Sequence, residues 1–277
     1  MKKTAIIYHA NCPDGFGAAW AAWKKFKKNA DYIPVEHNGV APAGLTGKDV
    51  YIVDFSYDAD TLHFLIRANK KVVVLDHHIS ARSNVESVPE HIFDNDHSGA
   101  VIAWQYFHPK AALPKMLRHI EDVDLWRFVL PKTKEISAAL NLVPMTFKNW
   151  DAFARDIENP ERRKARIAQG VTAITYSSEL IAQIAKNARE VIFEGYKAFA
   201  INSPVFRSEL GNMLISPEHP IAIIWYEKKG VIKASLRSRK EVDVSKIVTR
   251  YGGGGHEQAA GFHLPATGPL PWQEVKT

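Results

Sequence analysis

Three short apolar segments of the chain each end on a polar side chain. The segments are residues 3–9, 49–54 and 71–76, and their last residues are His9, Asp54 and Asp76. Helical patterns follow the first two segments at residues 15–23 and 61–68. Alternating strands and helices of this length predict a parallel sheet with helices on both faces. Because ligands bind at the carboxyl ends of the strands in such a sheet, we expect the three polar side chains to lie close together.

The remainder of the chain predicts a helical stretch followed by a second sheet. Residues 104–188 have a mostly helical pattern that prolines interrupt. Short apolar runs, typical of strands, follow at residues 198–202, 221–226 and 231–236, and Gly230 suits the tight turn of a hairpin between the last two. We therefore predict an α/β protein in three parts. They are an N-terminal parallel-sheet domain (residues 1–130), a helical connector (131–195) and a smaller α/β C-terminal domain (196–277).

The composition excludes several classes of protein. The single cysteine, Cys12, allows neither an internal disulfide nor a multi-cysteine zinc site, so we expect a reducing, cytoplasmic environment. The apolar run after Lys2 and Lys3 is too short for a signal peptide. No run approaches the ~20 apolar residues of a membrane helix, so we expect no membrane partner. The net charge of +6 favours partners that carry phosphate.

The polar residues at the strand ends are of the kinds that bind divalent metal ions. Asp76 continues into His77 and His78, Asp54 ends another strand, and His9 and Asp14 flank the loop after the first. Imidazole and carboxylate ligands without cysteine favour Mn²⁺, Mg²⁺, Fe²⁺ or Co²⁺ over structural zinc. Several acids in one crevice repel each other unless a cation compensates. The sequence therefore predicts a divalent metal site.

The same residues resemble the motifs of the DHH phosphoesterase superfamily. The matching elements are the Asp76-His77-His78 triplet, Asp54 at the end of its strand, and the His9-Ala-Asn-Cys-Pro-Asp14-Gly loop. The glycine-rich run from Tyr251 to Phe262 is similar to the signature of the DHH-associated C-terminal domain. The superfamily includes RecJ-type exonucleases, nanoRNA and pAp phosphatases, cyclic-dinucleotide phosphodiesterases and family II pyrophosphatases. The two signatures occur in the expected order and make the resemblance specific.

This resemblance implies a particular set of ligands. The first metal would be held by His9, Asp14 and Asp54, with Asp54 bridging to a second metal. The second metal would take His77 and a later aspartate, for which Asp122 and Asp124 are the candidates, with a slight preference for Asp122. Asp76, His77 and His78 form the catalytic triplet, in which Asp76 orients a ligand and His78 contacts the phosphate or protonates the leaving oxygen.

One position departs from the motif of the superfamily. Many members have a second aspartate two residues after the first, where this chain has Phe16. That aspartate serves the second metal, so its absence puts the number of bound ions in question. Two Mn²⁺ ions are our expectation, with Mg²⁺ or Co²⁺ as alternatives.

The resemblance also implies a substrate-binding region in the C-terminal domain. Arginine guanidinium groups suit phosphate, and glycines let backbone N–H groups approach an anion closely. The expected substrate-binding residues are Arg237, Ser238, Gly254, Gly255 and His256. With the metals in the N-terminal domain, the active site is expected in the cleft between the two domains.

We therefore expect a Mn²⁺-dependent phosphoesterase that hydrolyses short oligonucleotides, or linear or cyclic dinucleotides, to mononucleotides. The chain has no appended nucleic-acid domain, which favours compact nanoRNase-type members over RecJ-type exonucleases of long strands. The alternatives are hydrolysis of polyphosphate or pyrophosphate, a pAp-type phosphatase, and a catalytically silent nucleotide-binding protein. The sequence does not indicate an oligomeric state, and a homodimer remains open.

Four lysines, Lys24, Lys25, Lys27 and Lys28, lie at the end of the first predicted helix. Cations there complement the helix dipole, and this is the interpretation that we favour. Binding of nucleic acid by the same lysines is the alternative.

Overall fold

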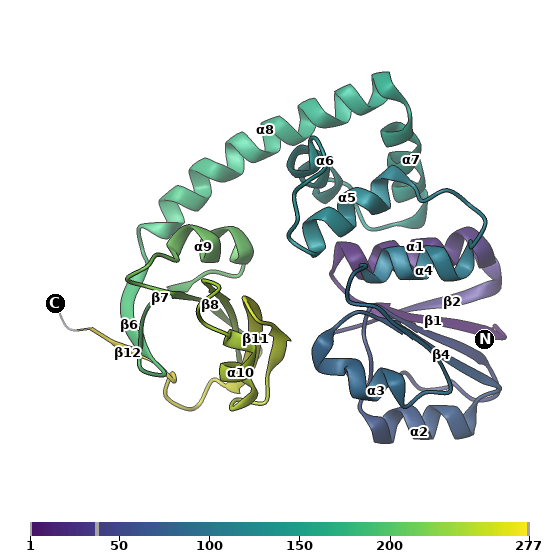
Figure 1. Cartoon of the computed structure of the whole chain (residues 1–277), viewed down its shortest axis with the longest axis horizontal. Helices are drawn as coiled ribbons and strands as arrows, with labels where there is room; N and C mark the ends of the chain where they lie inside the picture. Colours follow the sequence, from purple (N-terminus) through teal and green to yellow (C-terminus); the bar gives the residue numbers. More distant parts are fainter. Residues whose placement is uncertain (1, 37–38, 276–277) are drawn as a thin grey trace. The chain divides into compact units, whose positions relative to one another are not determined.

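The computed structural model describes residues 2–36 and 39–275, and the chain forms two compact units (Figure 1). The first unit comprises residues 1–174 and the second residues 175–277. Helix α8 (Pro160–Ala185) contributes to both units. The boundaries that we expected at residues 130 and 195 remain predictions.

The first unit is built on a five-stranded parallel sheet with the order β2-β1-β3-β4-β5. The strands are β1 (Thr4–His9), β2 (Ala30–Val35), β3 (Asp49–Val53), β4 (Lys71–Asp76) and β5 (Glu90–Phe93). Helices connect them on both sides: α1 (Pro13–Phe26), η1 (Lys27–Asn29), α2 (Ala59–Ala68), η2 (Ile79–Ala81), α3 (Arg82–Glu86) and α4 (Gly99–Phe107).

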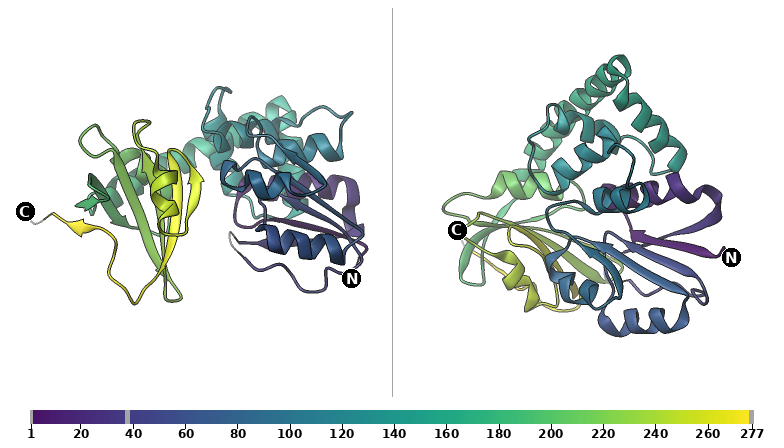
Figure 2. Two further views of the ribbon diagram at one scale, coloured as in Figure 1. Left: turned by 60° about the horizontal axis from the view of Figure 1, so that its bottom comes forward. Right: turned by 45° about the vertical axis from the view of Figure 1, so that its right-hand side comes forward.

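Alternation along the buried strands gives the sheet two apolar faces. In β4, Val73 and Leu75 pack on the side of α1 and α4, whereas Val72 and Val74 pack on the side of α2 and α3. Figure 2 shows the resulting three layers of helices, sheet and helices. Because both faces are covered, the three central strands β1, β3 and β4 are mainly apolar, as parallel strands usually are.

The strand order places a topological switch point between β1 and β3. The chain runs from β1 to β2 on one side and then to β3 on the other side. In an open α/β sheet, loops that leave the carboxyl ends of the strands at such a point separate and leave a crevice. His9 is the last residue of β1, and Asp54 follows the last residue of β3. The fold itself therefore brings the first two predicted ligands together.

The first unit is completed by helices beyond α4. They are α5 (Lys115–Asp124), α6 (Thr133–Asn141), α7 (Phe147–Glu158) and the first part of α8. Trp150, Phe153 and Ile157 of α7 join the core that α1 and α4 form on the sheet. Trp20 and Trp104, from α1 and α4, stack in this core with ring centroids 5.6 Å apart.

The second unit contains a seven-stranded mixed sheet with the order β10-β11-β9-β8-β7-β6-β12. Only the β7–β8 pair is parallel. Its elements are β6 (Arg189–Phe193), β7 (Tyr196–Asn202), α9 (Arg207–Leu214), β8 (Ile221–Lys228), β9 (Val231–Ser238), α10 (Val244–Thr249), β10 (Gly254–His256), β11 (Ala259–Pro265) and β12 (Gln273–Glu274).

The two faces of this sheet are covered by different helices. Ile224 of β8 packs with Leu210 of α9 on one face, whereas Leu236 of β9 packs with Val248 of α10 on the other. The predicted hairpin joins β8 to β9, and both Lys229 and Gly230 have positive φ there. Such a turn matches the twist of the flanking strands.

The predicted fold class is confirmed: a parallel-sheet domain precedes a smaller α/β domain with a mixed sheet. Sequence analysis did not predict the two edge strands of the first sheet, β2 and β5. β2 contains Pro34, and β5 is only four residues long and largely exposed. Among the described residues, no helix has the length and apolar character that are needed to cross a membrane.

Candidate metal centre

His9 and Asp14 lie on either side of the short loop that joins β1 to α1. Helix α1 begins at Pro13, a residue suited to a first helical turn, so Asp14 lies in that turn. A Cβ atom on Gly15 would lie 2.2 Å from the carbonyl oxygen of His9. Only glycine therefore allows α1 to start this close to the end of β1.

Asp54 occupies a strained position directly after β3. Its φ of 64° lies in the left-handed region that few side chains adopt, while its backbone N–H donates to the carbonyl of Leu75 at 2.9 Å. A Cβ on Gly99, the first residue of α4, would lie 2.5 Å from Oδ1 of Asp54. Backbone strain of this kind clusters at functional sites.

The N-terminus of α4 fixes the carboxylate of Asp14. The backbone N–H groups of Gly99 and Ala100 donate to its two oxygens at 2.6 and 3.0 Å. These N–H groups have no partner within the helix, and the positive end of the helix dipole favours a negative charge there. Asp14 is therefore oriented by α4 as well as by its own helix.

The Asp76-His77-His78 triplet begins at the last residue of β4, and Asp76 contacts both histidines. Its Oδ1 accepts from the backbone N–H of His77 at 2.8 Å and lies 2.7 Å from Nδ1 of His78. Asp76 is completely buried. These contacts would let Asp76 orient both histidines, and its supporting role stays a prediction.

His77 lies at the centre of three carboxylates. Its Nε2 atom is 3.3 Å from Oδ1 of Asp54, 3.6 Å from Oδ2 of Asp124 and 3.7 Å from Oδ2 of Asp14. On the other side of Asp54, Nδ1 of His9 is 3.5 Å from Oδ2. These residues come from four separate segments, and they form a single cluster, which we call the His77 cluster.

Burial and neighbouring charges strongly shift the pKa values of the residues in the His77 cluster. Burial, followed by the charges of Asp54 and Asp124, raises the pKa of Asp14 well above its usual range. Burial also raises the pKa of Asp124 to about 6. For His77, burial lowers the pKa, but the neighbouring carboxylates outweigh burial and raise it to about 10. The protein alone can thus reduce the repulsion only by retaining protons.

The donor set of the cluster fits a divalent cation. Both carboxylate oxygens of Asp54 are buried and accept no hydrogen bond of normal geometry from a described residue. Donor atoms separated by 3.3–3.7 Å suit one ion between them, since metal–oxygen bonds measure about 2.1 Å. There are three sets of possible donor atoms, each within 4.8 Å, and Asp54 and His77 each belong to two of them. Carboxylates and imidazoles suit Mn²⁺, Mg²⁺ or Fe²⁺.

The two candidate aspartates of α5 have different environments. Asp124 lies beside His77, whereas both carboxylate oxygens of Asp122 are engaged elsewhere. Asp122 accepts from the backbone N–H groups of residues 129 and 130 at 2.9 and 3.0 Å and from the hydroxyl of Thr133 at 2.6 Å. Although the sequence slightly favoured Asp122, this geometry leads us to propose Asp124 as the ligand.

The predicted substrate-binding residues lie on strands β9 and β10 of the second unit, which are separated by β11. The Arg237 guanidinium donates to Oγ of Ser208 at 2.7 Å, and burial followed by the nearby charge of Arg207 lowers its pKa. Ser238 is buried and donates to the carbonyl of Val242 at 2.6 Å. Gly254, Gly255 and His256 form β10, which pairs with β11. The glycine run is therefore part of a packed sheet, as expected from its apolar neighbours.

Several solved structures have a fold similar to that of this chain. A DHH domain, described as belonging to a member of a family of ribosomal proteins, is 15% identical with a TM-score of 0.65, covering 94% of this chain and 82% of that chain. An exopolyphosphatase-related protein from Bacteroides fragilis is 13% identical with a TM-score of 0.50, covering 97% of this chain and 88% of that chain. At such identities the likeness concerns the fold alone.

Sequence comparison identifies the family. The DHHA1 domain family matches residues 201–274. The uncharacterized protein R106 of Acanthamoeba polyphaga mimivirus is 33% identical over 299 residues, covering 98% of this chain and 70% of that protein. The chain belongs to the DHH phosphoesterase superfamily. The resemblance that the motifs indicated is thereby confirmed, and the metal dependence of this superfamily agrees with the donor set of the His77 cluster.

Phe16, the departure from the DHH motif, points into the core. Its ring lies 4.8 Å from that of Trp150 and 5.1 Å from that of Phe147. Phe16 lies two residues after Asp14 in α1, so the two side chains occupy different faces of the helix. Since Phe16 is almost completely buried in this aromatic group, an aspartate at the same position of this backbone would face apolar rings.

Sequence analysis missed two residues that lie at or beside the His77 cluster. Cys12 lies with His9 and Asp54 in one set of possible ligands, although burial raises the pKa of its thiol. The position of Cys12 between the predicted ligands His9 and Asp14 could have indicated that it lies near the metal site. Gly99, which contacts Asp54 and Asp14, follows Ser98. Serine ahead of an apolar helical run is typical of a helix start, and could have located this N-terminus.

Asparagine substitutions at positions 122 and 124 are expected to change different properties, stability at position 122 and metal binding at position 124. Asp124→Asn removes a charge beside His77 and should weaken Mn²⁺ binding at least tenfold with little change in stability. Asp122→Asn places an amide NH₂ against groups that donate and should lower the free energy of unfolding by about 1–3 kcal/mol. Calorimetric Mn²⁺ titration and urea unfolding of both variants test this. The reverse pattern would assign the ligand role to Asp122.

Restoring the aspartate of the DHH motif at position 16 is expected to destabilise the protein without adding a metal site. Phe16→Asp buries a carboxylate among aromatic rings and should cost at least about 3 kcal/mol of unfolding free energy. The control Phe16→Leu keeps an apolar group and should cost about 1.5 kcal/mol. The number of Mn²⁺ ions bound per folded chain, measured by elemental analysis, should be unchanged. A higher number for Phe16→Asp would contradict this placement.

Proposed function

We propose that the chain is a Mn²⁺-dependent phosphodiesterase that hydrolyses short oligonucleotides or dinucleotides to mononucleotides. The observation that carries the proposal is the cluster of three carboxylates around the buried His77 at the switch point of a DHH-family sheet. A cluster with this much negative charge favours a divalent cation over any organic ligand.

The proposed chemistry divides between a metal ion and the side chains around it. A divalent cation, when bound, polarises the phosphoryl group and acidifies a water molecule for in-line attack. Asp54, Asp14, Asp124, His9 and His77 would hold it. A second ion is part of the proposal, since Asp54 and His77 each belong to two sets of donor atoms.

His78 is the proposed group that contacts the phosphate. Its Nδ1 is 2.7 Å from Oδ1 of Asp76, which fixes the orientation of the ring. Burial lowers the pKa of His78, but the hydrogen bond and the charge of Asp76 outweigh burial and raise it. A histidine held in its protonated form can stabilise the charge that develops on the phosphate and donate a proton to the leaving oxygen.

Two arginines of the second unit support a phosphate-bearing substrate. Arg237 lies next to Arg207, whose guanidinium stands over the ring of Tyr226 at 5.7 Å and donates to Ser235 at 3.4 Å. Among the described residues, no carboxylate lies within 4 Å of either guanidinium. Neighbouring guanidinium groups repel each other, and a phosphate group would bind both. We propose this arginine pair as the substrate-phosphate subsite; Arg207 was not among the residues singled out in the sequence.

Turnover of a 5′-phosphorylated RNA dinucleotide tests the proposed function. Metal-stripped protein should be inactive, and added Mn²⁺ should restore the release of mononucleotides. Asp54→Asn should lower turnover at least a thousandfold, because it removes a charge from the centre of the cluster, and should leave the far-ultraviolet circular dichroism unchanged. Polyphosphate and a 24-residue RNA are assayed in parallel.

The parallel substrates separate the competing functions. Consumption of polyphosphate without cleavage of the dinucleotide would replace the proposal with phosphoanhydride hydrolysis, the activity suggested by the description of the Bacteroides fragilis protein. Nucleotide binding without metal and without turnover of any substrate would indicate a silent binding protein.

A further inference from the structure

The basic character of the chain is concentrated at one edge of the first sheet. Four segments lie there, at the starts of β1 to β4 and the ends of α1 and α2: residues 2–4, 24–31, 47–50 and 67–71. We call them the basic edge. These segments carry a net charge of +8, so the rest of the chain carries −2 of the total of +6. Their ten cations are Lys2, Lys3, Lys24, Lys25, Lys27, Lys28, Lys48, Arg67, Lys70 and Lys71; their two carboxylates are Asp31 and Asp49.

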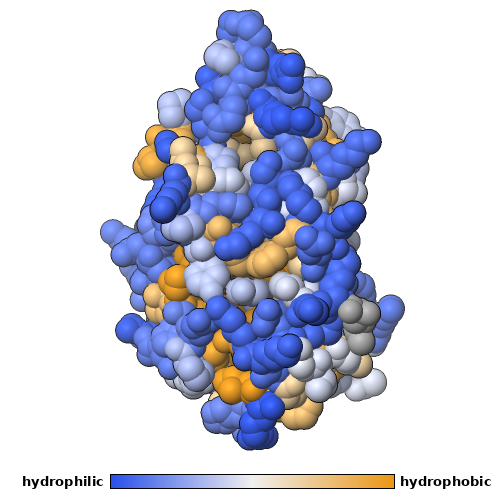
Figure 3. Space-filling view, turned by 90° about the vertical axis from the view of Figure 1, so that its right-hand side faces the viewer, coloured by the Kyte–Doolittle hydropathy of each residue, from blue (hydrophilic) through white to orange (hydrophobic). Residues whose placement is uncertain are grey.

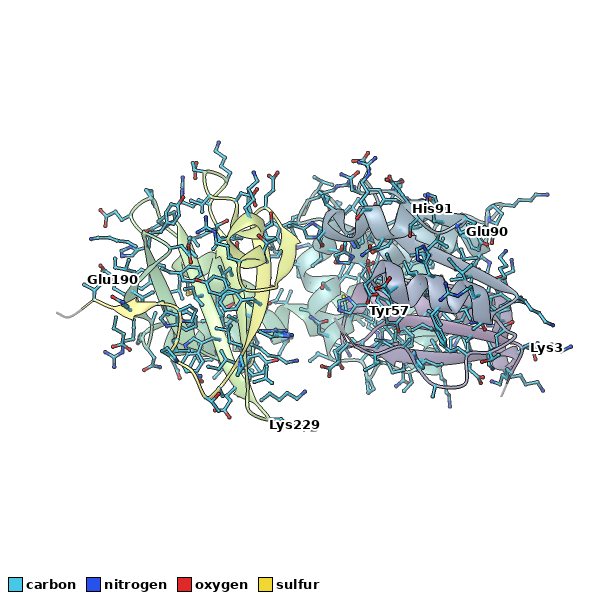
Figure 4. The ribbon with its side chains drawn as sticks, turned by 90° about the horizontal axis from the view of Figure 1, so that it is seen from below. Lys3, Tyr57, Glu90, His91, Glu190 and Lys229 are labelled. Atoms are coloured by element: carbon cyan, nitrogen blue, oxygen red, sulfur yellow. The ribbon has the colours of Figure 1, made fainter. Side chains whose placement is uncertain are left out.

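Strand register brings the four segments side by side. Thr4 pairs with both Ala30 and Asp49, and Asp49 pairs with Lys71. Because neighbouring strands are about 4.8 Å apart, the four strand starts extend along about 15 Å. In Figure 4, Lys3 lies at this end of the first unit, and Tyr57, which follows β3, lies toward the other end. Figure 3 faces the same side and shows many hydrophilic residues with apolar patches between them.

Internal contacts neutralise less than half of these cations. Lys2 and Lys48 share Asp31, Lys24 pairs with Asp151, and Lys71 pairs with Glu90. The other six cations have no carboxylate within 4 Å among the described residues, and they are Lys3, Lys25, Lys27, Lys28, Arg67 and Lys70.

Helix dipoles do not account for the surplus either. Each helix C-terminus carries about half a negative charge, so α1 and α2 together offset about one of the six positive charges that have no carboxylate partner. The dipole explanation that we favoured from the sequence therefore covers only a small part of the edge. Cations gathered in this way repel one another and create a positive potential that attracts an anionic partner.

We propose that the basic edge binds the phosphate backbone of single-stranded nucleic acid. The edge lies at the opposite ends of the strands from the His77 cluster, about 15–20 Å away for strands of five or six residues. At the axial rise of about 3.4 Å per nucleotide in one strand of a double helix, a strand that keeps its bases stacked would place about four phosphates along the edge. None of the large exposed apolar side chains of the described residues belongs to the edge, which disfavours a membrane surface. The choice of nucleic acid rests on the proposed function.

Binding of a fluorescein-labelled 30-residue oligouridylate, measured by anisotropy in EDTA between 50 and 200 mM KCl, tests the proposal. The edge variant combines Lys3→Gln, Lys25→Gln, Lys28→Gln and Lys70→Gln, none of which breaks an ion pair. The control combines Lys134→Gln, Lys148→Gln, Lys186→Gln and Lys229→Gln, exposed lysines elsewhere that change the net charge equally.

The edge variant should bind at least tenfold more weakly at 50 mM KCl, and the slope of log K against log salt should flatten by about 3, since each lost phosphate contact contributes about 0.7. The control should stay within about twofold of the wild type. Equal weakening by both variants, or no binding by the wild type, would overturn the proposal. So would loss of binding to anionic phospholipid vesicles in the edge variant while RNA binding persists. Since EDTA prevents hydrolysis, these outcomes are independent of the dinucleotide assay.

Discussion

The mutual repulsion of the carboxylates around His77, two of which are buried, is the constraint on which the structure of the first unit depends. Asp14, Asp54 and Asp124 each place an oxygen within 3.7 Å of one imidazole nitrogen. Without a cation, the protein must hold protons against their ordinary pKa values, which is why the pKa of His77 is raised to about 10. A divalent ion removes this conflict, so metal binding and the stability of the folded unit should be coupled.

The backbone around the cluster is adapted to this crowding. Asp54 takes a left-handed conformation, and Gly15 and Gly99 leave out side chains that would collide with His9 and Asp54. The N-terminus of α4 supplies two N–H groups to Asp14. These features stabilise the ligands from outside the cluster, and they leave both oxygens of Asp54 available to an ion.

Much of this arrangement could be predicted from the sequence because the ligands follow strands. Parallel strands converge at one edge, so His9, Asp54 and Asp76 were expected to meet, and the His77 cluster forms at that edge. The choice between Asp122 and Asp124 could not be predicted, because it depends on the loop that wraps around Asp122 after α5. Likewise, the contact of Gly99 with Asp54 joins residues 45 positions apart, and no local pattern reports such a contact.

The charge distribution illustrates a second limit of sequence analysis. The lysines at the end of α1 look like ordinary helix-terminal cations when read alone. Only the strand register joins them to Lys3, Lys48 and Lys70, which are distant in sequence. The first unit thus has the His77 cluster, which is rich in carboxylates, at one end of its strands and the basic edge at the other.

The most direct test of the account is a crystal structure of the Mn²⁺-soaked protein with anomalous diffraction data collected at the manganese absorption edge. If Asp54 and His77 bind the ion, anomalous density should lie within bonding distance of both residues and should be lost in crystals of Asp54→Asn. Anomalous density elsewhere only, or none at saturating Mn²⁺, would contradict the assignment of the His77 cluster as the metal centre.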